Sequence, residues 1–474
     1  MLLYFIISLY ILIGIFIIVR LLLNGMRPTK TLAWLLAIFT IPVGGMFLYL
    51  MLGRNRRKNK LFELRHTPKI TSYIKKALDQ YSPITEEEYE EHHKMISLIT
   101  KNSYFSPCTG NDLKLLKNGR ATFQAIFNAL EKAEHFIHLE YYIFEEGELT
   151  NGLFELFRKK IKNGVKVRIL YDGIGSRSLS KKYINKLKHI GVEIHKFLPI
   201  RFGKFLSSIN YRNHRKIIVI DDEIAFTGGI NVSDKYVNGD PDLGAWYDMH
   251  LQLKGPIVHN LQAIFAMDWY LVSGDDEILD ISYFHPHKKT DGSTAQIVHS
   301  GPDSDFSATQ QMYFSIINEA KEYVYITNPY IIPGESILDA LKVASLSGVD
   351  VRLLLSSDKS DNIIVKWCIR SYFERLLQAG VKIYLFPKGF LHSKTVVADN
   401  TISSVGTTNL DVRSFEQNYE VNAVIYDDSF AVALKNDFLN DCSKSIRLNY
   451  DTFVLRPWHE KLKEGVAKIF SPIL

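Results

Sequence analysis

Cysteine is scarce in this sequence of 474 residues, which contains only Cys108, Cys368 and Cys442. No two of them stand in the C-x-x-C spacing that is typical of zinc and redox motifs. Three scattered cysteines also cannot build the disulfide framework of a small secreted protein. The sequence therefore excludes a disulfide scaffold and a cysteine-based zinc site, and it fits a reducing compartment.

Two other features are missing. No nucleotide, metal or organic cofactor motif occurs, so we expect neither a cofactor nor a metal. A strong charge bias is also absent, because the formal net charge is +6. This mild positive charge suits an anionic partner, either membrane or nucleic acid, without choosing between them. The length has room for two domains and accessory segments.

Long hydrophobic runs dominate the N-terminus, at residues 2–23 and 32–52. Each is long enough to cross a bilayer core as a helix. A cleaved signal peptide is the alternative for the first run, but no basic segment precedes it and no clear small-residue cleavage site follows. We therefore expect a transmembrane helical hairpin over residues 1–60. Pro42, Gly44 and Gly45 leave a kinked or re-entrant second segment open.

Flanking charge predicts the orientation of this hairpin. The end of the second run is followed by five basic residues, Arg54, Arg56, Arg57, Lys58 and Lys60. The first run and the connection carry three, Arg20, Arg27 and Lys30. Because the richer side faces the cytoplasm, we expect a multi-pass protein of the plasma membrane with a cytoplasmic catalytic body. The polar residues 61–108 are interpreted as a linker to that body.

Two short stretches repeat the same pattern. Residues 213–221 read N-H-R-K-I-I-V-I-D, and residues 391–399 read L-H-S-K-T-V-V-A-D. A Gly-x-x-Asn follows each at the same offset, ending at Asn231 and Asn409. Residues two apart on a strand face the same side, so each His and Lys can reach one pocket. The candidate catalytic residues are thus His214, Lys216, Asp221, His392, Lys394 and Asp399, with Asn231 and Asn409 as substrate-binding amides.

The chain around these motifs is also duplicated. Residues 133–139, 164–170 and 191–194 correspond to residues 320–326, 348–354 and 380–383. Each matched segment is a short β-rich run after a helix-like stretch, which predicts an α/β fold of two tandem α/β sandwich halves. We place these halves at residues 109–285 and 286–474, with one site at their interface. The first half has an additional basic and aromatic loop, residues 198–212, which suits either a membrane interface or an ordinary surface position.

The paired motifs contain the groups that phosphodiester cleavage without a metal requires. Such cleavage needs a nucleophile, an acid for the leaving alkoxide and positive charge around the phosphoryl oxygens. Histidine can serve as nucleophile or acid near neutral pH. Lys216 and Lys394 supply the charge, and the glycines before each Asn allow close backbone approach. The residues themselves therefore indicate phosphodiester transfer.

These motifs resemble the double H-K-D signature of the phospholipase D superfamily, so the two halves are expected to be phospholipase D-like. Together with the hairpin, residues 409–415 and residues 469–474, they make the whole chain similar to bacterial cardiolipin synthases of that superfamily. The resemblance implies that two phosphatidylglycerols become cardiolipin and glycerol through a covalent phosphatidyl-histidine. It further implies that His214 is the nucleophile and His392 the acid and base. Asp221 and Asp399 would be supporting groups, and Asp248 and Glu420 would orient the histidines.

One departure from the family pattern and several alternatives remain. The Ser that is common after the first Gly of Gly-x-x-Asn is replaced by Gly229 and Thr407. The expected partners are phosphatidylglycerol and anionic membrane lipid, with no nucleic acid and an open oligomeric state. The alternatives are a transferase or hydrolase with another acceptor, a membrane-tethered nuclease, and an inactive lipid-binding scaffold. An inactive scaffold is expected to lack a His or Lys in one motif, and both motifs are complete.

Overall fold

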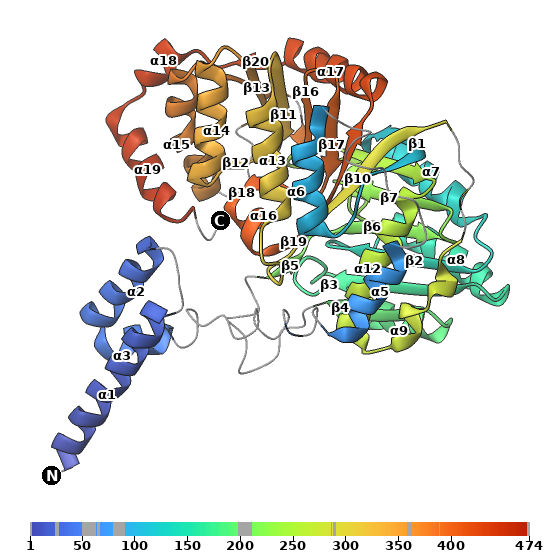
Figure 1. Ribbon diagram of the computed structural model, residues 1–474, viewed down its shortest axis with the longest axis horizontal. Helices are drawn as coiled ribbons and strands as arrows, with labels where there is room; N and C mark the ends of the chain where they lie inside the picture. The colour runs from blue at the N-terminus through green and yellow to red at the C-terminus, as the bar shows by residue number, and fades with distance from the viewer. Residues whose placement is uncertain are drawn as a thin grey trace. The chain divides into compact units, whose positions relative to one another are not determined.

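The computed structural model describes residues 2–23, 28–49, 63, 67–78, 91–197, 211–285, 287, 291–357, 363–387 and 389–471 (Figure 1). The chain divides into two compact units. One contains the described residues up to Tyr49, and the other contains those from Glu63 onward. Most of the basic and aromatic loop, residues 198–210, lies outside the described residues.

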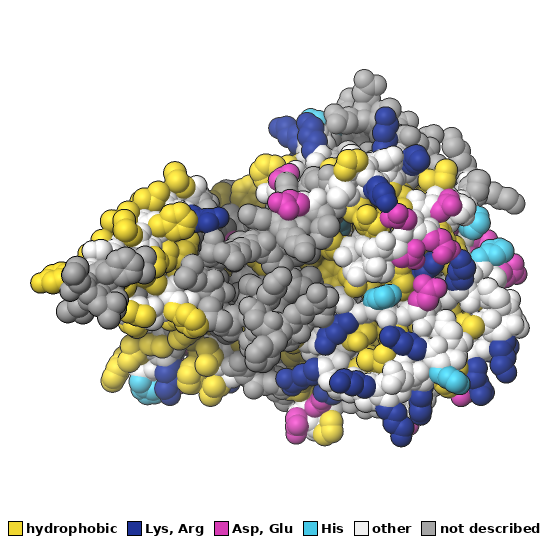
Figure 2. All heavy atoms as spheres, turned by 90° about the horizontal axis from the view of Figure 1, so that it is seen from below, with side chains coloured by type: hydrophobic (Ala, Val, Ile, Leu, Met, Phe, Trp, Pro, Cys, Tyr) yellow, Lys and Arg dark blue, Asp and Glu magenta, His cyan; other side chains and the backbone are white. Residues whose placement is uncertain are grey.

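The described part of the N-terminal unit contains three helices, α1 (Leu2–Leu23), α2 (Pro28–Thr40) and α3 (Pro42–Leu48). A small core joins them through Ile17, Leu21, Ile38, Met46 and Tyr49. Large apolar side chains are nevertheless exposed on all three helices, among them Phe16, Leu23, Phe39 and Val43, and Figure 2 shows hydrophobic side chains over much of this part of the surface.

The second hydrophobic run is divided into two helices, as the alternative of a kinked segment allowed. It is divided at Ile41, whose φ of −127° is not helical, and Pro42 begins a new helix. Proline has no backbone N–H and clashes with the preceding turn, so it ends a helix that approaches it. In the part of the chain that the structure describes, we find no helix with the length and apolarity to cross a membrane. The expected transmembrane hairpin is therefore not confirmed, and residues 50–60 lie outside the described residues.

A single sheet forms the centre of the second unit, and its described part has sixteen strands: fifteen follow one continuous order, and β5 (Arg212–Asn213) lies off it. The strands of the first half follow the order β4-β3-β2-β6-β7-β9-β1. Their bounds are β1 (Cys108–Lys117), β2 (Phe136–Tyr141), β3 (Lys166–Asp172), β4 (Glu193–Phe197), β6 (Lys216–Ile220), β7 (Ile224–Gly228) and β9 (Met249–Lys254).

The strands of the second half repeat this order as β14-β13-β11-β16-β17-β19-β10, with β20 added at the edge. Their bounds are β10 (Ser293–Ser300), β11 (Tyr323–Asn328), β13 (Asp350–Ser356), β14 (Lys382–Phe386), β16 (Thr395–Ala398), β17 (Ile402–Gly406), β19 (Asn418–Tyr426) and β20 (Ile446–Arg447). Antiparallel pairing of β1 with β10 joins the halves edge to edge, so that Cys108 lies opposite Ala295. The internal repeat of the sequence is therefore a repeat of topology.

Helices cover both faces of this sheet, as Figure 1 shows. Strand β6 explains why, because Ile217 and Val219 join a core that extends under both halves, while Ile218 and Ile220 join a second core on the opposite face. Successive side chains of a strand point to opposite faces, so an apolar run buries both. The shared core contains α12 (Ile257–Ser273) and α17 (Asp428–Ser443). On the opposite face, the first half is covered by α7 (Asn118–Leu130), α8 (Glu148–Lys162) and α9 (Lys181–His189). The second half is covered there by α13 (Ala308–Glu319), α14 (Glu335–Leu346) and α15 (Ile363–Gln378). Helices α18 (Tyr450–Val454) and α19 (Trp458–Ile469) pack beside α15. The predicted α/β architecture of two tandem halves is confirmed.

The expected linker, residues 61–108, is in part a packed component of this unit. It contains α5 (Pro68–Leu78) and α6 (His93–Ser103). Helix α5 adds Ile70, Tyr73 and Ala77 to the shared core, and α6 adds Met95, Ile96 and Ile99 to the core of the second half. These residues recur at helical spacing, a short apolar stripe that the polar composition of the segment concealed.

Candidate active site

Two very short strand pairs bring the H-x-K motifs of the two halves together. Strand β5 (Arg212–Asn213) pairs with the start of β19, and β15 (Phe390–Leu391) pairs with β8 (Trp246–Tyr247). As a result, the backbone N–H of His214 donates to the carbonyl of Tyr419 at 2.9 Å, and that of His392 to the carbonyl of Tyr247 at 2.7 Å. Each motif is thus anchored to the other half.

The carboxylates that hold the histidines are exchanged between the halves in the same way. Nδ1 of His214 lies 3.0 Å from Oε2 of Glu420, and Nδ1 of His392 lies 2.7 Å from Oδ2 of Asp248. Both carboxylate side chains are fully buried. Since a carboxylate on one ring nitrogen orients a catalytic imidazole and leaves the other free to react, neither half has a complete site by itself.

The two motif lysines lie buried beside these histidines. Nζ of Lys216 donates to the carbonyl of His214 at 2.8 Å, and Lys394 makes the same bond to His392. Burial lowers the pKa of Lys216 to about 7. The positive charge of Lys394 also lowers this pKa, whereas the negative charge of Glu420 raises it. Burial also lowers the pKa of Lys394 to about 8. The two buried lysine charges repel each other. An anion such as a phosphodiester that binds between them would reduce this repulsion and stabilise both charges.

Burial disfavours the protonated form of both histidines. Burial lowers the pKa of His214, and the adjacent Glu420 partly offsets this effect. The pKa of His392 lies well below its ordinary value because of burial and the charges of Lys394 and Lys216. A neutral imidazole that donates Nδ1–H to a carboxylate has a free lone pair on Nε2. Both rings can therefore act as nucleophile or base.

The two histidine–carboxylate pairs are not equivalent. Thr407 donates its hydroxyl to Glu420. Burial would raise the pKa of Glu420, but the neighbouring His214 and Lys216 outweigh it and the pKa is lowered. At the matching position of the first half, a side chain on Gly229 would place Cβ 2.1 Å from Oδ1 of Asp248. Asp248 lacks a hydroxyl donor there, and burial raises its pKa to about 6. The glycine that departs from the family pattern is thus sterically required.

The two motif asparagines also differ. Oδ1 of Asn231 accepts from the backbone of Ile143 at 3.2 Å, and its Nδ2 donates to the hydroxyl of Tyr236 at 2.8 Å. Oδ1 of Asn409 is buried and has no hydrogen-bond partner among the described residues. Asn231 is therefore engaged by the protein, whereas the amide oxygen of Asn409 is available to a ligand.

Tyr236 belongs to the site, although no sequence pattern indicated it. Its hydroxyl lies 3.2 Å from Nδ1 of His392, the nitrogen that also contacts Asp248. The second half has Ser414 at the same offset from its Asn, so comparison of the repeats gave no signal for a tyrosine. Nδ1 of His392 consequently has two partners, and Nδ1 of His214 is held by Glu420.

Arg215, between His214 and Lys216, was also missed. Its guanidinium bonds Asp268 and donates through Nε to the carbonyl of Glu420 at 3.3 Å. The corresponding residue of the second motif is Ser393. The duplicated pattern therefore did not mark this position, although Arg215 supports the backbone of the carboxylate that holds His214.

The motif aspartates lie away from the reacting groups, which corrects their placement among the candidate catalytic residues. Asp221 follows the last residue of β6, whereas Lys216 is its first, and five residues of strand span roughly 16 Å. The Asp221 carboxylate accepts three backbone N–H groups, from Glu134, His135 and Phe136, at 2.6–2.8 Å. Asp399 accepts from Lys321, Glu322 and Tyr323 at 2.6–2.9 Å. Both side chains tie a helix-to-strand turn to the central strands.

A possible metal-binding set lies at the same far end of β6. Among the described residues, Asp222, His259 and His287 offer ligand atoms within 4.8 Å of one another. None of the three belongs to the motifs, and the sequence indicated no metal site. Because Asp222 is at the opposite end of the strand from Lys216, the set is separate from the histidine–lysine cluster.

The comparisons with known proteins agree with this geometry. The family model "Cardiolipin synthase, PLD-like domain" matches residues 126–269 and 313–442, and the model "Phospholipase_D-nuclease N-terminal" matches residues 9–54. A cardiolipin synthase of Halalkalibacterium halodurans is 41% identical over 97% of this chain and 92% of its own. A major cardiolipin synthase of Bacillus subtilis is 38% identical over 93% of both chains.

A solved structure also has this fold. The phosphatidylserine synthase of Haemophilus influenzae superposes with a TM-score of 0.63 over 80% of this chain and all of its own, at 13% identity. This likeness concerns the fold. The sequence matches show that the chain belongs to the cardiolipin synthase family of phospholipase D-like phosphatidyltransferases.

Proposed function

We propose that the protein transfers a phosphatidyl group from one phosphatidylglycerol to the terminal hydroxyl of another, giving cardiolipin and glycerol. The observation that carries this proposal is the pair of crossed histidine–carboxylate contacts around two buried lysines. Curated relatives of similar length named cardiolipin synthase support the choice of substrate.

The first half-reaction forms a covalent intermediate. The phosphodiester binds between Lys216 and Lys394, and Nε2 of His214 attacks phosphorus. A P–N bond forms, the bond from phosphorus to the glycerol oxygen breaks, and that oxygen takes a proton from His392. Glu420 stabilises the imidazolium that develops on His214. In the free site, the positive charges of the lysines disfavour protonation of His392. The negative charge of the bound substrate offsets this repulsion, so that His392 can carry the proton that it donates.

The second half-reaction reverses the proton transfer. The terminal hydroxyl of a second phosphatidylglycerol gives its proton to His392, and its oxygen attacks phosphorus. The P–N bond to His214 then breaks and the free imidazole is restored. Water or another alcohol in place of this hydroxyl would give hydrolysis or a different phospholipid. Product analysis with phosphatidylglycerol vesicles distinguishes these acceptors, and a matched assay with DNA tests the nuclease alternative.

The unequal carboxylates support this division of roles. The lowered pKa of Glu420 keeps it ionised beside His214, as a nucleophile that becomes cationic requires. The pKa of Asp248, about 6, lies near neutrality beside His392. A group that donates and later accepts a proton works best with partners that titrate near the working pH.

The N-terminal unit is proposed to anchor the enzyme in the plasma membrane, where its lipid substrates are. Support comes from the exposed apolar side chains of α1, α2 and α3 and from the match of residues 9–54 to the N-terminal family model. The basic residues 54–60 would then lie in the cytoplasm together with the catalytic unit.

A substrate with a nitrophenol leaving group tests the two histidine roles. This leaving group needs no protonation, so His392→Ala should still form the adduct and release a burst of nitrophenol. His214→Ala has lost the attacking atom and should release none. With phosphatidylglycerol, each variant should lose activity by roughly 10²–10⁴-fold or more. A burst that survives in His214→Ala, with lipid on the peptide that contains His392, would exchange the roles.

A further inference from the structure

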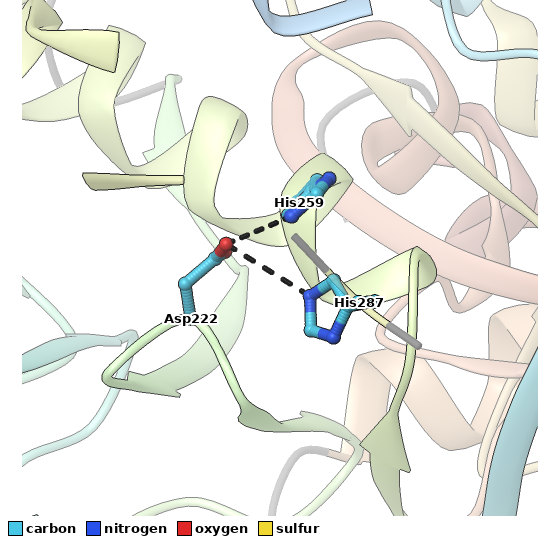
Figure 3. Close-up of side chains that lie close together, drawn as sticks. All are labelled: Asp222, His259 and His287. Carbon is cyan, nitrogen blue, oxygen red and sulfur yellow. Dashed lines mark ion pairs between the residues drawn. The ribbon is translucent and has the colours of Figure 1, made fainter. Parts of the chain in front are cut away.

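Three side chains from separate elements meet at the far end of β6 (Figure 3). Asp222 lies in the turn between β6 and β7, His259 in the first turn of α12, and His287 in the connector that leads to β10. Their side chains are 0%, 3% and 12% exposed. The close-up shows both imidazoles directed toward the Asp222 carboxylate.

The hydrogen bonds at this point do not satisfy the buried groups. Oδ2 of Asp222 lies 2.9 Å from Nε2 of His259 and accepts from the backbone N–H of His285 at 2.8 Å. Among the described residues, neither the buried Oδ1 of Asp222 nor Nε2 of His287 has a hydrogen-bond partner, and Nε2 of His287 lies 3.9 Å from Oδ2 of Asp222. A buried carboxylate oxygen without a partner is costly, and a cation beside it would remove that cost.

The second half provides an internal comparison. Asn400 is the counterpart of Asp222, because each directly follows the motif aspartate. The amide oxygen of Asn400 accepts from the hydroxyl of Tyr323 at 2.9 Å and from Nζ of Lys435 at 3.1 Å. At the same topological position, the second half thus has a neutral amide, Asn400, whose oxygen is hydrogen-bonded. The first half has a carboxylate, Asp222, which lies between two imidazoles and has one oxygen without a partner among the described residues.

We infer that Asp222, His259 and His287 bind one divalent transition-metal ion, for which Zn²⁺ is the best match. Zinc lies about 2.0–2.2 Å from His and Asp ligands, so the ligand atoms of a tetrahedral site are roughly 3.4 Å apart. The distances of 2.9 and 3.9 Å from Oδ2 to the two imidazole nitrogens lie on either side of this value. Two imidazoles favour zinc over calcium or magnesium, which prefer oxygen ligands.

Metal binding requires a defined proton change. Nε2 of His259 also lies 2.9 Å from the carbonyl of His285 and donates its proton in the metal-free state. In the metal complex this nitrogen coordinates through its lone pair, and the proton moves to Nδ1 or to solvent. Water completes the coordination.

The position of the ion indicates a structural role. It would fix the connector between the two halves to the first turn of α12 and to the end of a central strand. Asp222 is six residues from Lys216 along the chain, so the metal would stabilise the unit without contacting the phosphodiester.

The test measures metal retention by the full-length, tag-free protein purified in detergent. Wild type, His287→Ala and the neighbouring control His285→Ala are loaded with Zn²⁺ or Co²⁺ and desalted, and metal content is measured by mass spectrometry. We expect wild type and His285→Ala to retain about one ion per chain, with the visible absorption of tetrahedral Co²⁺. His287→Ala should retain little and lose that absorption.

Thermal unfolding gives a second measurement. Zinc should raise the unfolding midpoint of wild type and of His285→Ala, because a ligand that binds the folded state stabilises it. The midpoint of His287→Ala should not respond. A wild-type protein that retains no metal would overturn the inference, and so would a His287→Ala variant that retains as much metal as wild type.

Discussion

At the residue scale, two histidines with the same motif have different partners. His214 is held by a glutamate that is kept ionised and bonded by the Thr407 hydroxyl, whereas His392 shares Nδ1 between Asp248 and Tyr236. The difference originates in Gly229, where a side chain would occupy the space of the Asp248 carboxylate. Local sterics thus give duplicated motifs separate roles in the proposed reaction.

The carboxylates should therefore affect different steps. Glu420→Gln should suppress adduct formation, because the imidazolium of His214 loses its counter-charge, and the loss should persist with the nitrophenol substrate. Asp248→Asn should be impaired by roughly 10²–10⁴-fold with phosphatidylglycerol, but much less with nitrophenol. Burst amplitude and steady-state rate separate these effects. Equal sensitivity of both variants to the leaving group would contradict the division of roles.

The hydroxyl of Thr407 can be tested with a matched pair of variants. Thr407→Val keeps the shape of the side chain but removes the donor to Glu420, which should cost about 1–3 kcal/mol of stability or of transition-state binding. Thr407→Ser keeps the donor and should remain close to wild type. The comparison uses kcat/KM together with the midpoint of thermal unfolding. A Val variant as active and stable as the Ser variant would show that this bond is dispensable.

The lysine pKa values predict the pH dependence. Both are lowered, so the cationic form is present at low pH and is lost as the pH rises through about 7 for Lys216 and about 8 for Lys394. Because kcat/KM reports the free enzyme, it should fall above about pH 7. It should also fall as the pH drops through about 6, where protonated Asp248 no longer accepts from His392.

Lys216→Arg provides the control for that profile. A guanidinium remains charged throughout this range, so the alkaline decline of the variant should move to higher pH even if its maximal rate is lower. The unfolding midpoint measured across the same pH range excludes loss of fold as the cause. A wild-type decline only near the ordinary lysine pKa of about 10.4 would contradict the lowered values.

At the scale of elements, the active site depends on two strand pairs of two residues each. Pairing of β5 with β19 and of β15 with β8 places each histidine beside a carboxylate of the other half. The motif aspartates act at the other end of the central strands, where each accepts three backbone N–H groups of a helix-to-strand turn. Each motif therefore has a structural end at its aspartate and a proposed chemical end at its histidine and lysine.

Asp399→Asn should accordingly reduce stability more than chemistry. The amide places an N–H group against backbone N–H donors, which should lower the free energy of unfolding by about 1–3 kcal/mol. Denaturant unfolding measures this loss, and kcat per folded molecule should stay within a few-fold of wild type. A variant that is stable but inactive would instead place Asp399 in the chemistry.

At the scale of the whole molecule, two halves of the same strand order form one sheet that is joined at β1 and β10, and one core extends under both halves. The site uses groups of both halves, so neither half is expected to act alone. The N-terminal unit has its own small core and exposes large apolar side chains, which is the basis for proposing that it binds the membrane.

Protease accessibility tests the proposed placement. Protease added to intact spheroplasts should leave the chain after Arg54 uncut, because the catalytic unit is proposed to lie in the cytoplasm. Cleavage should appear after lysis, which is the internal control. Digestion of the catalytic unit without lysis would reverse the orientation, and recovery of the intact protein in the soluble fraction would contradict membrane anchoring.

The sequence by itself determined the duplication and the α/β class and predicted the candidate reacting side chains, because these depend on local patterns: a spacing of two on a strand, and strands alternating with helices. The sequence was less informative about segments whose structure depends on what packs against them. The polar segment before residue 108 contains the packed helices α5 and α6, and the second hydrophobic run is divided at Ile41.

The tertiary structure decided which groups meet. Glu420 is 206 residues from His214 and Asp248 is 144 residues from His392, so no local pattern specifies that the carboxylates are exchanged between the halves. The same holds for Tyr236 beside His392 and for Asp222 between two histidines of other elements. Such contacts arise because strands pair and because buried polar groups must find hydrogen-bond partners, and both depend on the folded chain as a whole.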